Sequence, residues 1–281
     1  MKFTKMHGIG NDYIYINAIE ENIDDGSELA KKLSNRNYGI GSDGLILIKS
    51  SNKADFYMDM YNLDGSKGKM CGNGIRCVGK YVYDKGLTSK DKIRVETGSG
   101  IKDLTLHIED GKVNNITVDM GKPITNPKDI PVISEEKEII GMPIEIDGSK
   151  FNITCVSFGN PHAVVFVDNA AEINLEELGP KFEHHEMFPD RVNTEFVQVV
   201  DKNRVIMRVW ERGSGETLAC GTGACACVFA CIRNNKTNNK VTVELLGGEL
   251  TIEYDQKTDR VYMTGPAVTV FEGNVDLTQL I

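Results

Sequence analysis

Two cysteines stand in the same short setting at widely separated points of the chain. Cys-Gly-Asn-Gly at 71–74 and Cys-Gly-Thr-Gly at 220–223 each precede a stretch with helical character. A cysteine at a helix N-terminus lies in a partial positive field, which stabilises the thiolate and lowers the thiol pKa. Glycines leave backbone N–H groups open to a ligand, and such groups bind carboxylates at helix starts. Each motif therefore combines a tunable acid–base group with a seat for an anion.

The two motifs belong to a longer internal repeat at an offset of 149 residues. At this offset Gly10-Asn11 falls on Gly159-Asn160, Met58 falls on Met207, and the two cysteine motifs coincide. Each match is weak alone, but their agreement on one offset and in one order indicates a duplicated fold. The sequence therefore predicts two similar halves, each with one Cys-Gly-x-Gly motif.

Such a pair of cysteines suits inversion of a carbon centre. If the halves face each other across a pseudo-two-fold axis, Cys71 and Cys220 lie on opposite faces of one substrate. A thiolate removes the α-proton of an amino acid, and a thiol on the far side delivers another. A single base would return the proton to the face it left. The alternative is that each motif is only a tight turn into a buried helix, which the duplication makes less attractive.

The elements around these motifs indicate an α/β protein of the α+β type. Helices are expected at 28–35, 75–85, 175–185 and 224–234. The last of these is apolar on every side, which is typical of a helix buried by strands all round. Alternating or continuous apolar runs predict strands at 45–49, 55–61, 92–97, 101–108, 113–119, 162–167, 195–200, 204–210, 240–246, 249–254 and 260–264.

Composition excludes several classes of partner. The 281 residues carry a net charge of −9, which argues against nucleic acid or an anionic membrane as the main partner. No apolar run is long enough for a membrane span, and the N-terminus lacks the pattern of a signal peptide. The seven cysteines are an odd number in a chain expected to be cytoplasmic, which argues against a disulfide framework. They include no Cys-x-x-Cys pair, so a zinc site is not expected. A cytoplasmic protein without a metal is predicted.

Polar residues beside glycine turns or at predicted strand ends are candidates for the substrate cleft. Neutral amides suit a zwitterion because they donate to a carboxylate and accept from an ammonium group. Glu211-Arg212 could clamp both groups, and His162 could tune a thiol. The alternatives are local turn caps, a solvated ion pair and a structural histidine. The amides are Asn11, Asn62, Asn73, Asn160 and Asn193.

Longer motifs connect these candidates, and with them the chain resembles the diaminopimelate epimerases over essentially its whole length. The matching stretches are MHGIGND (6–12), GIGSDG (39–44), YNLDGS (61–66), MCGNGIRC (70–77), FGNPH (158–162), RVN (191–193) and ERGSGETLACGTGACA (211–226). Several long blocks in the right order make the resemblance specific.

The resemblance implies an isomerase that converts LL-2,6-diaminopimelate to the meso form, on the route to lysine and peptidoglycan precursors. It implies no pyridoxal phosphate, no other cofactor and no metal. Cys71 and Cys220 would be the acid–base pair, and His162 and Glu211 are similar to residues that tune the thiols. By motif position, the carboxylate would be held by Gly72, Asn73, Gly221 and Thr222, and the substrate bound by Asn11, Asn62, Asn160, Asn193, Glu211 and Arg212.

The resemblance also implies a fold and an assembly. Each of two pseudo-symmetric domains would be a rolled, mostly antiparallel sheet around a central helix, with the C-terminal tail returning to the first domain. We expect an N-terminal half of residues 1–119 plus 264–281, with Cys71, and a C-terminal half of residues 120–263, with Cys220. From its prolines, the stretch 120–143 is interpreted as the linker and the entry to the second half. A homodimer is implied. Some members have a substrate-contacting glutamine where this chain has Gly44, so that contact is in doubt here.

Three other functions fit part of the pattern. A proline or hydroxyproline racemase resembles the chain at both cysteines, but typically has a histidine where this chain has Asn73. A cysteine hydrolase or transferase would use Cys71 activated by His162, with a covalent intermediate. A non-catalytic amino-acid-binding protein would bind without exchanging the α-proton.

Overall fold

The computed structural model describes residues 1–279 and divides into two compact units. One unit comprises Met1–Val118 together with the C-terminal segment from Gly265. The other comprises Asp119–Thr264. Both are α+β folds dominated by sheet, as the sequence predicted.

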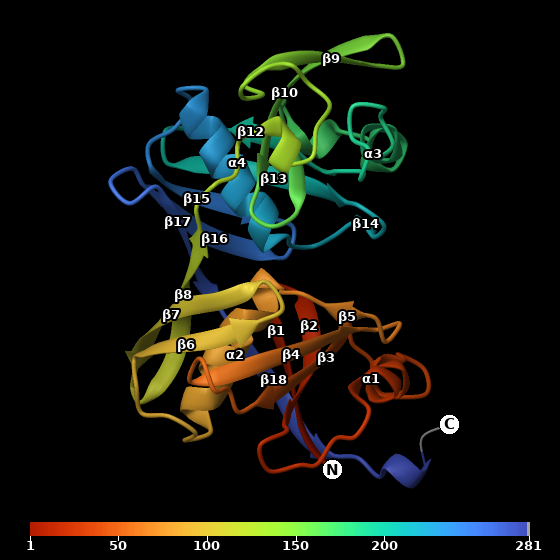
Figure 1. Ribbon diagram of the computed structural model, residues 1–281, viewed down its shortest axis with the longest axis vertical. Coiled ribbons are helices and arrows are strands. Elements are labelled where there is room, and N and C mark those ends of the chain that lie inside the picture. Colours follow the sequence, from red (N-terminus) through yellow and green to blue (C-terminus); the bar gives the residue numbers. More distant parts are fainter. Residues whose placement is uncertain (280–281) are drawn as a thin grey trace. The chain divides into compact units, whose positions relative to one another are not determined.

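The first unit contains two helices and a mixed sheet (Figure 1). Its strand pairs are antiparallel except for β2 with β3 and β4 with β6, which run parallel. The elements are β1 (Lys2–Gly8), β2 (Asn11–Asn17), α1 (Gly26–Ser34), β3 (Gly44–Lys49), β4 (Phe56–Asn62), β5 (Lys67–Gly68), α2 (Gly72–Asp84), β6 (Lys92–Thr97), β7 (Gly100–Glu109), β8 (Lys112–Gly121), β18 (Val268–Asn274) and the 3₁₀ helix η3 (Leu277–Gln279).

The second unit repeats this plan. Its parallel pairs are β11 with β12 and β13 with β15, at the places that correspond to the parallel pairs of the first unit. The elements are η1 (Pro127–Asp129), β9 (Met142–Ile146), β10 (Ser149–Ser157), β11 (Pro161–Phe166), η2 (Ala170–Glu172), α3 (Leu175–Glu183), β12 (Asn193–Val199), β13 (Arg204–Glu211), β14 (Gly215–Glu216), α4 (Gly221–Arg233), β15 (Lys240–Leu245), β16 (Gly248–Asp255) and β17 (Arg260–Pro266).

The internal repeat is present in three dimensions. α1 and α3 begin at residues 26 and 175, and α2 and α4 begin at residues 72 and 221, so both pairs keep the offset of 149. The extra strand that pairs with β1 is β18, from the C-terminal end of the chain, whereas the one that pairs with β10 is β9. The predicted pseudo-symmetric pair of sheets around helices is thus confirmed.

Each unit has a helix packed against its strands, visible in Figure 1 as α2 and α4. α2 contacts β1, β2 and β7, and α4 contacts β10, β11, β12, β13, β15 and β16. The side chains of α4 are small and apolar, which lets strands approach from several directions. Residues 224–231 of α4 are all buried, as its composition predicted.

The stretch 120–143, interpreted from sequence as the linker and the entry to the second half, packs as part of the second unit. Ile130, Val132 and Ile139 are buried in the hydrophobic core of that unit. Ile124 forms a β-bridge with Ser157. The prolines therefore mark irregular but packed chain, because apolar residues between them enter the core.

Within the described part of the chain, the structure has no helix both long and apolar enough to cross a membrane.

Candidate active site

Both cysteines are the N-cap residues of their helices. Cys71 precedes α2 with φ −130° and ψ 121°, and Cys220 precedes α4 with φ −121° and ψ 109°. Each Sγ accepts a hydrogen bond from the backbone N–H of the third helical residue, Gly74 at 3.3 Å and Gly223 at 3.4 Å. The helices begin a turn earlier than expected from sequence, because the glycines themselves are helical. Both sulfur atoms thus lie at the positive end of a helix dipole.

Cys71 is partly exposed and has an amide partner. Its Sγ donates to Asn11 Oδ1 at 3.1 Å, and Asn11 Nδ2 donates to Asp43 Oδ2 at 2.8 Å. The Tyr13 phenol lies beside the same thiol. Burial, with the charge of Cys71 next in effect, raises the pKa of Tyr13 well above its usual value. The surroundings of Cys71 are therefore neutral amide and phenol groups.

A network of charges holds the loop that carries Asn11. Arg36 Nη2 donates to Asp12 Oδ1 and to Asp43 Oδ1, both at 2.9 Å, and Lys5 forms an ion pair with Asp12. Burial alone would raise the pKa of Asp12, but the hydrogen bonds and charges of Arg36 and Lys5 lower it overall. Asp12 and Asp43 are thus held as acceptors, and Asp43 orients the Asn11 amide.

Cys220 is buried and lies among acidic groups. Its Sγ is 3.5 Å from Thr222 Oγ1. Burial raises the pKa of Cys220 well above its usual value, and the negative charges of Glu211 and Glu195 add to the effect. Burial also raises the pKa of Glu211, whose Oε1 accepts from Thr217 Oγ1 at 2.5 Å. The surroundings of Cys220 are therefore ionisable, unlike those of Cys71.

His162 and Glu195 form a buried pair near Cys220. Both side chains have no exposed surface, and His162 Nδ1 lies 2.6 Å from Glu195 Oε1. The other ring nitrogen, Nε2, lies 3.1 Å from Asn160 Oδ1. Glu195 is a residue that the sequence reasoning missed. The available signal was an acid at the start of the predicted strand 195–200, directly before Phe196 and Val197.

Asn193 and Arg212 shape the loop after β13. Asn193 Nδ2 donates to Pro161 O at 2.8 Å, and Asn193 Oδ1 accepts from the Arg212 N–H at 3.0 Å. The Arg212 side chain is exposed and donates to Asp190 O at 2.8 Å. Asn193 therefore links the start of β11 to the turn that carries Arg212.

Of the predicted residues of the first unit, Asn11, Gly72 and Asn73 lie at the start of α2, whereas the hydrogen-bond partner of the Asn62 side chain lies in the turn after β4. Gly72 and Asn73 are the first two residues of that helix, and both are buried. Asn62 ends β4, where its Nδ2 donates to Ser66 Oγ at 2.9 Å. Gly221 occupies the corresponding first position of α4 in the other unit.

Two glycines create the turns before Asn11 and Asn160. Gly10 has φ +88° and Gly159 has φ +104°, a region that glycine adopts without the strain of a side chain. Because Gly10 and Gly159 are 149 residues apart, Asn11 and Asn160 follow equivalent turns in the two units.

Gly44 has no room for any side chain. A Cβ there would overlap the backbone carbonyl oxygen of Tyr61 and lie 2.8 Å from Tyr13 Cε1. A glutamine at this position would therefore need the backbone to move, because the obstacle is main chain.

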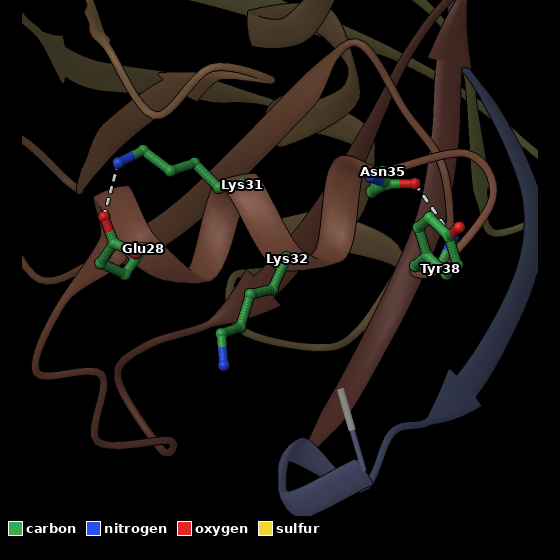
Figure 2. A pocket seen from close by; sticks show the side chains of 5 residues that line it. All are labelled: Glu28, Lys31, Lys32, Asn35 and Tyr38. Atoms are coloured by element: carbon green, nitrogen blue, oxygen red, sulfur yellow. Dashed lines mark hydrogen bonds and ion pairs between the residues drawn. The ribbon is translucent and has the colours of Figure 1, made fainter. Parts of the chain in front are cut away.

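A surface pocket lies beside α1. Figure 2 shows Glu28 paired with Lys31 at 2.5 Å, and Asn35 Oδ1 accepting from the Tyr38 N–H. Lys32 completes the lining. None of the candidate site residues lines this pocket. Among residues 1–279, no cluster of three or more His, Cys, Asp or Glu is placed to hold a metal ion.

Structural comparison places the fold among known architectures. A phenazine biosynthesis protein of the PhzF family from Bacillus anthracis aligns with a TM-score of 0.72 at 18% identity, covering 99% of each chain. A hydroxyproline epimerase from Agrobacterium vitis aligns with a TM-score of 0.67 at 14% identity, covering 99% of this chain and 93% of the other. At these identities the likeness shows a shared fold.

Sequence comparison is far closer. The family model described as diaminopimelate epimerase matches residues 3–125 and 154–270. A diaminopimelate epimerase from Acetivibrio thermocellus is 59% identical over 280 residues, covering 100% of both chains. One from Methanococcus maripaludis (strain S2 / LL) is 56% identical over 277 residues, covering 99% of this chain and 100% of the other. With a cysteine capping the corresponding helix of each unit and full-length identity at this level, the chain belongs to the diaminopimelate epimerase family.

Proposed function

We propose that this protein is an isomerase that converts LL-2,6-diaminopimelate to meso-diaminopimelate, using Cys71 and Cys220 as its two acid–base groups. The observation that carries the proposal is the equivalent placement of the two thiols. Each caps a helix whose first turn is glycine-rich, at the same position of a duplicated unit. Full-length relatives named diaminopimelate epimerase support the choice of substrate.

In the proposed reaction the α-carbon of one amino-acid centre lies between the two sulfur atoms. One cysteine, as thiolate, takes the α-proton, so that a C–H bond breaks and an S–H bond forms. The electron pair is delocalised into the adjacent carboxylate, which helix N–H groups stabilise. The other cysteine, as thiol, then gives its proton to the opposite face of the carbon. The roles are exchanged after one turnover, since the donor has become the thiolate.

The other predicted residues are assigned roles within this proposal. Gly72, Asn73, Gly221 and Thr222 hold the reacting carboxylate at the two helix starts, and His162 and Glu211 tune the thiols. The raised pKa of Glu211 supports a part for this residue in proton transfer, because the pKa of its carboxyl group lies closer to neutral pH than that of a free glutamate. The substrate-binding residues are proposed to be Asn11, Asn62, Asn160, Asn193, Glu211 and Arg212.

We further propose that the two units are the N- and C-terminal epimerase halves and that the protein is a homodimer in the cytoplasm. Val268 and Val270 lie on one face of β18 and are exposed, which supports a role for this strand in assembly. The cysteines of the chain are free, which fits a reducing compartment. Light scattering coupled to size exclusion tests the dimer.

Incubation with LL-diaminopimelate in heavy water tests substrate and chemistry together. The expected result is the meso isomer with deuterium at the inverted centre. The same assay with proline and trans-4-hydroxyproline is expected to show no exchange. Exchange of proline without exchange of diaminopimelate would overturn the assignment, as would binding of diaminopimelate without deuterium incorporation.

A further inference from the structure

Glu195 is a buried acid that the proposed reaction does not yet use. Its side chain has no exposed surface, and Oε1 contacts His162 Nδ1 at 2.6 Å. Its second oxygen, Oε2, has no hydrogen-bond partner among residues 1–279. A buried carboxylate that leaves one oxygen unsatisfied is costly to the folded state. Packing alone therefore does not account for an acid at this place in β12.

The duplicated unit shows that the fold does not need this acid. The residue that corresponds to Glu195 at the repeat offset is Ile46, which is buried in β3. The two play the same packing role. A Cβ at Gly74 would lie 2.8 Å from Ile46 Cδ1, and a Cβ at Gly223 would lie 2.7 Å from Glu195 Oε1. An aliphatic side chain fills the position beside Cys71, and a carboxylate fills it beside Cys220.

The partner of Glu195 differs between the units in the same way. His162 corresponds to Tyr13 at the repeat offset. In the parallel pairs, His162 is opposite Asn193, the first residue of β12, and Tyr13 is opposite Gly44, the first residue of β3. The first unit thus has a phenol and an aliphatic group behind its cysteine, and the second has an imidazole and a carboxylate. The acid and the histidine occur together in one unit and are both absent from the other.

Hydrogen-bond chemistry defines what the carboxylate does to the ring. An ionised carboxylate accepts only, so at 2.6 Å the proton of this contact belongs to His162 Nδ1. The remaining nitrogen, Nε2, lies 3.1 Å from Asn160 Oδ1. Because Nε2 of a ring protonated only on Nδ1 is an acceptor, it forms a hydrogen bond with Asn160 when the amide turns its NH₂ group toward the ring. We propose that Glu195 is a positioning residue of the reaction, which keeps the proton on His162 Nδ1 and presents Nε2 to Asn160. The inference rests on the proposed function, in which His162 tunes a thiol and Asn160 binds substrate.

Other titratable groups surround the pair. Glu211 from β13 and Cys220 from the start of α4 interact electrostatically with it. Cys155 from β10 and Cys227 from α4 are buried thiols whose pKa is raised by burial and, in smaller part, by the charge of Glu195. Glu211 and Cys220 are thus the titratable groups of neighbouring elements whose charges act on the pair.

Nitrogen NMR of the full-length protein labelled with ¹⁵N-histidine tests the inference without any variant of Glu195. The chain has five histidines, and the signals of His162 are assigned by their loss in His162→Gln. The expected result is a proton on Nδ1 under the conditions of the activity assay. A neutral ring with its proton on Nε2 would overturn the proposal.

Variants then connect the pair to catalysis. Glu195→Ile installs the residue of the other unit, and we expect kcat/KM to fall by about 10- to 100-fold, the usual effect of losing a carboxylate that orients a functional histidine. Its NMR spectrum should show His162 protonated on Nε2, with a changed pH profile of kcat/KM. Glu195→Gln keeps an acceptor of the same shape, so it should keep the Nδ1 proton and recover most of the activity.

The matched control is Thr194→Val, at the neighbouring buried residue of β12. Thr194 Oγ1 has no hydrogen-bond partner within residues 1–279, so this change alters the strand without touching the pair. It should leave kcat/KM and the His162 signals unchanged. A folded Glu195→Ile enzyme with the wild-type pH profile and wild-type kcat/KM would contradict the inference. If Glu195→Ile does not fold, the wild-type spectrum and Glu195→Gln still decide the question.

The two proposals fail separately. A protonated Nδ1 with no turnover of diaminopimelate would end the proposed function and leave the His162–Glu195 pair intact. Turnover of diaminopimelate by a protein whose His162 carries its proton on Nε2 would end the inference alone.

Discussion

At the scale of the residue, a cysteine sulfur is the N-cap acceptor of α2 and of α4, a role that side-chain oxygens usually fill. Serine, threonine, aspartate and asparagine are the preferred N-caps, because their oxygens accept from the free N–H groups of the first turn. Here the Sγ atoms of Cys71 and Cys220 accept those bonds. A thiolate accepts a hydrogen bond more strongly than a thiol does, so the cap also stabilises the charged form of the base.

Replacing either cysteine by serine separates the cap from the chemistry. Cys71→Ser and Cys220→Ser should keep the helix N-cap, because serine is a good cap. An alcohol does not exchange protons at neutral pH as a thiol does, so kcat for epimerisation should fall by at least about 10² to 10⁴. The measurement is deuterium incorporation at the α-carbon, with circular dichroism to verify the fold.

The matched control for these variants is Cys231→Ala. Cys231 is a buried cysteine of α4, eleven residues beyond Cys220 and so about 16 Å along the helix axis. Its replacement should leave kcat unchanged. Full activity in either serine variant would rule out the two-thiol mechanism.

The raised pKa of Glu211 makes a prediction about stability. Burial raises the pKa of this carboxyl in the folded protein, so the folded state binds more protons than the unfolded state between the two pKa values. The contribution of Glu211 to stability therefore falls as pH rises from its unfolded pKa of about 4.3 through the higher folded value. Glu211→Gln removes this dependence.

Urea unfolding of wild type and Glu211→Gln at a series of pH values measures the effect. The free energy of unfolding of the wild type, relative to that of the variant, should become smaller as pH increases over that window. A difference that stays constant with pH, or that grows in favour of the wild type, would show that the carboxyl is not held in a raised-pKa environment.

At the scale of the element, glycines decide how closely the strands and helices approach. Gly74 and Gly223 let Ile46 and Glu195 lie against the first turns of α2 and α4. Gly44 allows β3 to pass beside the carbonyl of Tyr61. The consequence is that each capping cysteine is backed by tightly packed strands with little freedom to move.

The tight approach at Gly44 predicts a large difference between two alanine substitutions. In Gly44→Ala the new Cβ meets the backbone carbonyl of Tyr61, which moves only with its strand, so we expect a loss near the upper end of about 1–3 kcal/mol in the free energy of unfolding. In Gly68→Ala the nearest atom is Cε of Met60, at 2.8 Å, the flexible end of a side chain.

Gly68→Ala is therefore the control, with an expected loss below about 1 kcal/mol. Both variants are compared by urea denaturation under the same conditions. Equal losses for the two substitutions would mean that the strands around Gly44 yield as readily as the Met60 side chain.

At the scale of the whole molecule, duplication gives two units with one plan and different chemistry. Equivalent helices begin 149 residues apart, and equivalent strands pair in the same directions. Yet Cys71 has Tyr13 and Asn11 beside it, whereas Cys220 has Glu211 and the Glu195 field. The two units therefore share their secondary structure and strand pairing, but different side chains surround the two sulfur atoms.

The proposed reaction requires both thiols to reach one carbon atom, which predicts sensitivity to oxidants. A mild thiol oxidant should inactivate the ligand-free enzyme by joining Cys71 to Cys220, and a reductant should restore it. Mass spectrometry of peptides from the oxidised protein should contain the 71–220 disulfide. Substrate present during oxidation should protect.

The control is the same treatment of Cys71→Ser, which should yield no cross-linked peptide that contains residue 220. Resistance of the ligand-free wild type to the oxidant would count against two thiols that share one substrate carbon.

The two-unit organisation and the buried helix of the second unit were predictable, because both depend on patterns of residues along the chain. The offset of 149 and the apolar stretch 224–234 predicted two related units and a buried helix, and both are present. The starts of α2 and α4 were each predicted three residues late, because glycine has low helix propensity and the capping sulfur was not counted as an acceptor. The stretch 120–143 was interpreted as the linker and the entry to the second half because of its four prolines, although Ile130 and Ile139 lie in a core.

Sequence alone determined the duplication, the glycine-rich turns that carry the cysteines, and membership of the family, because each depends on the order of residues along the chain. Only the tertiary structure decided which groups surround each sulfur. Glu195 reaches His162 because β11 and β12 pair in parallel with His162 opposite Asn193, and Glu195 lies two residues further on the same face. A strand's partner and register are set by packing between distant segments, which no local pattern encodes.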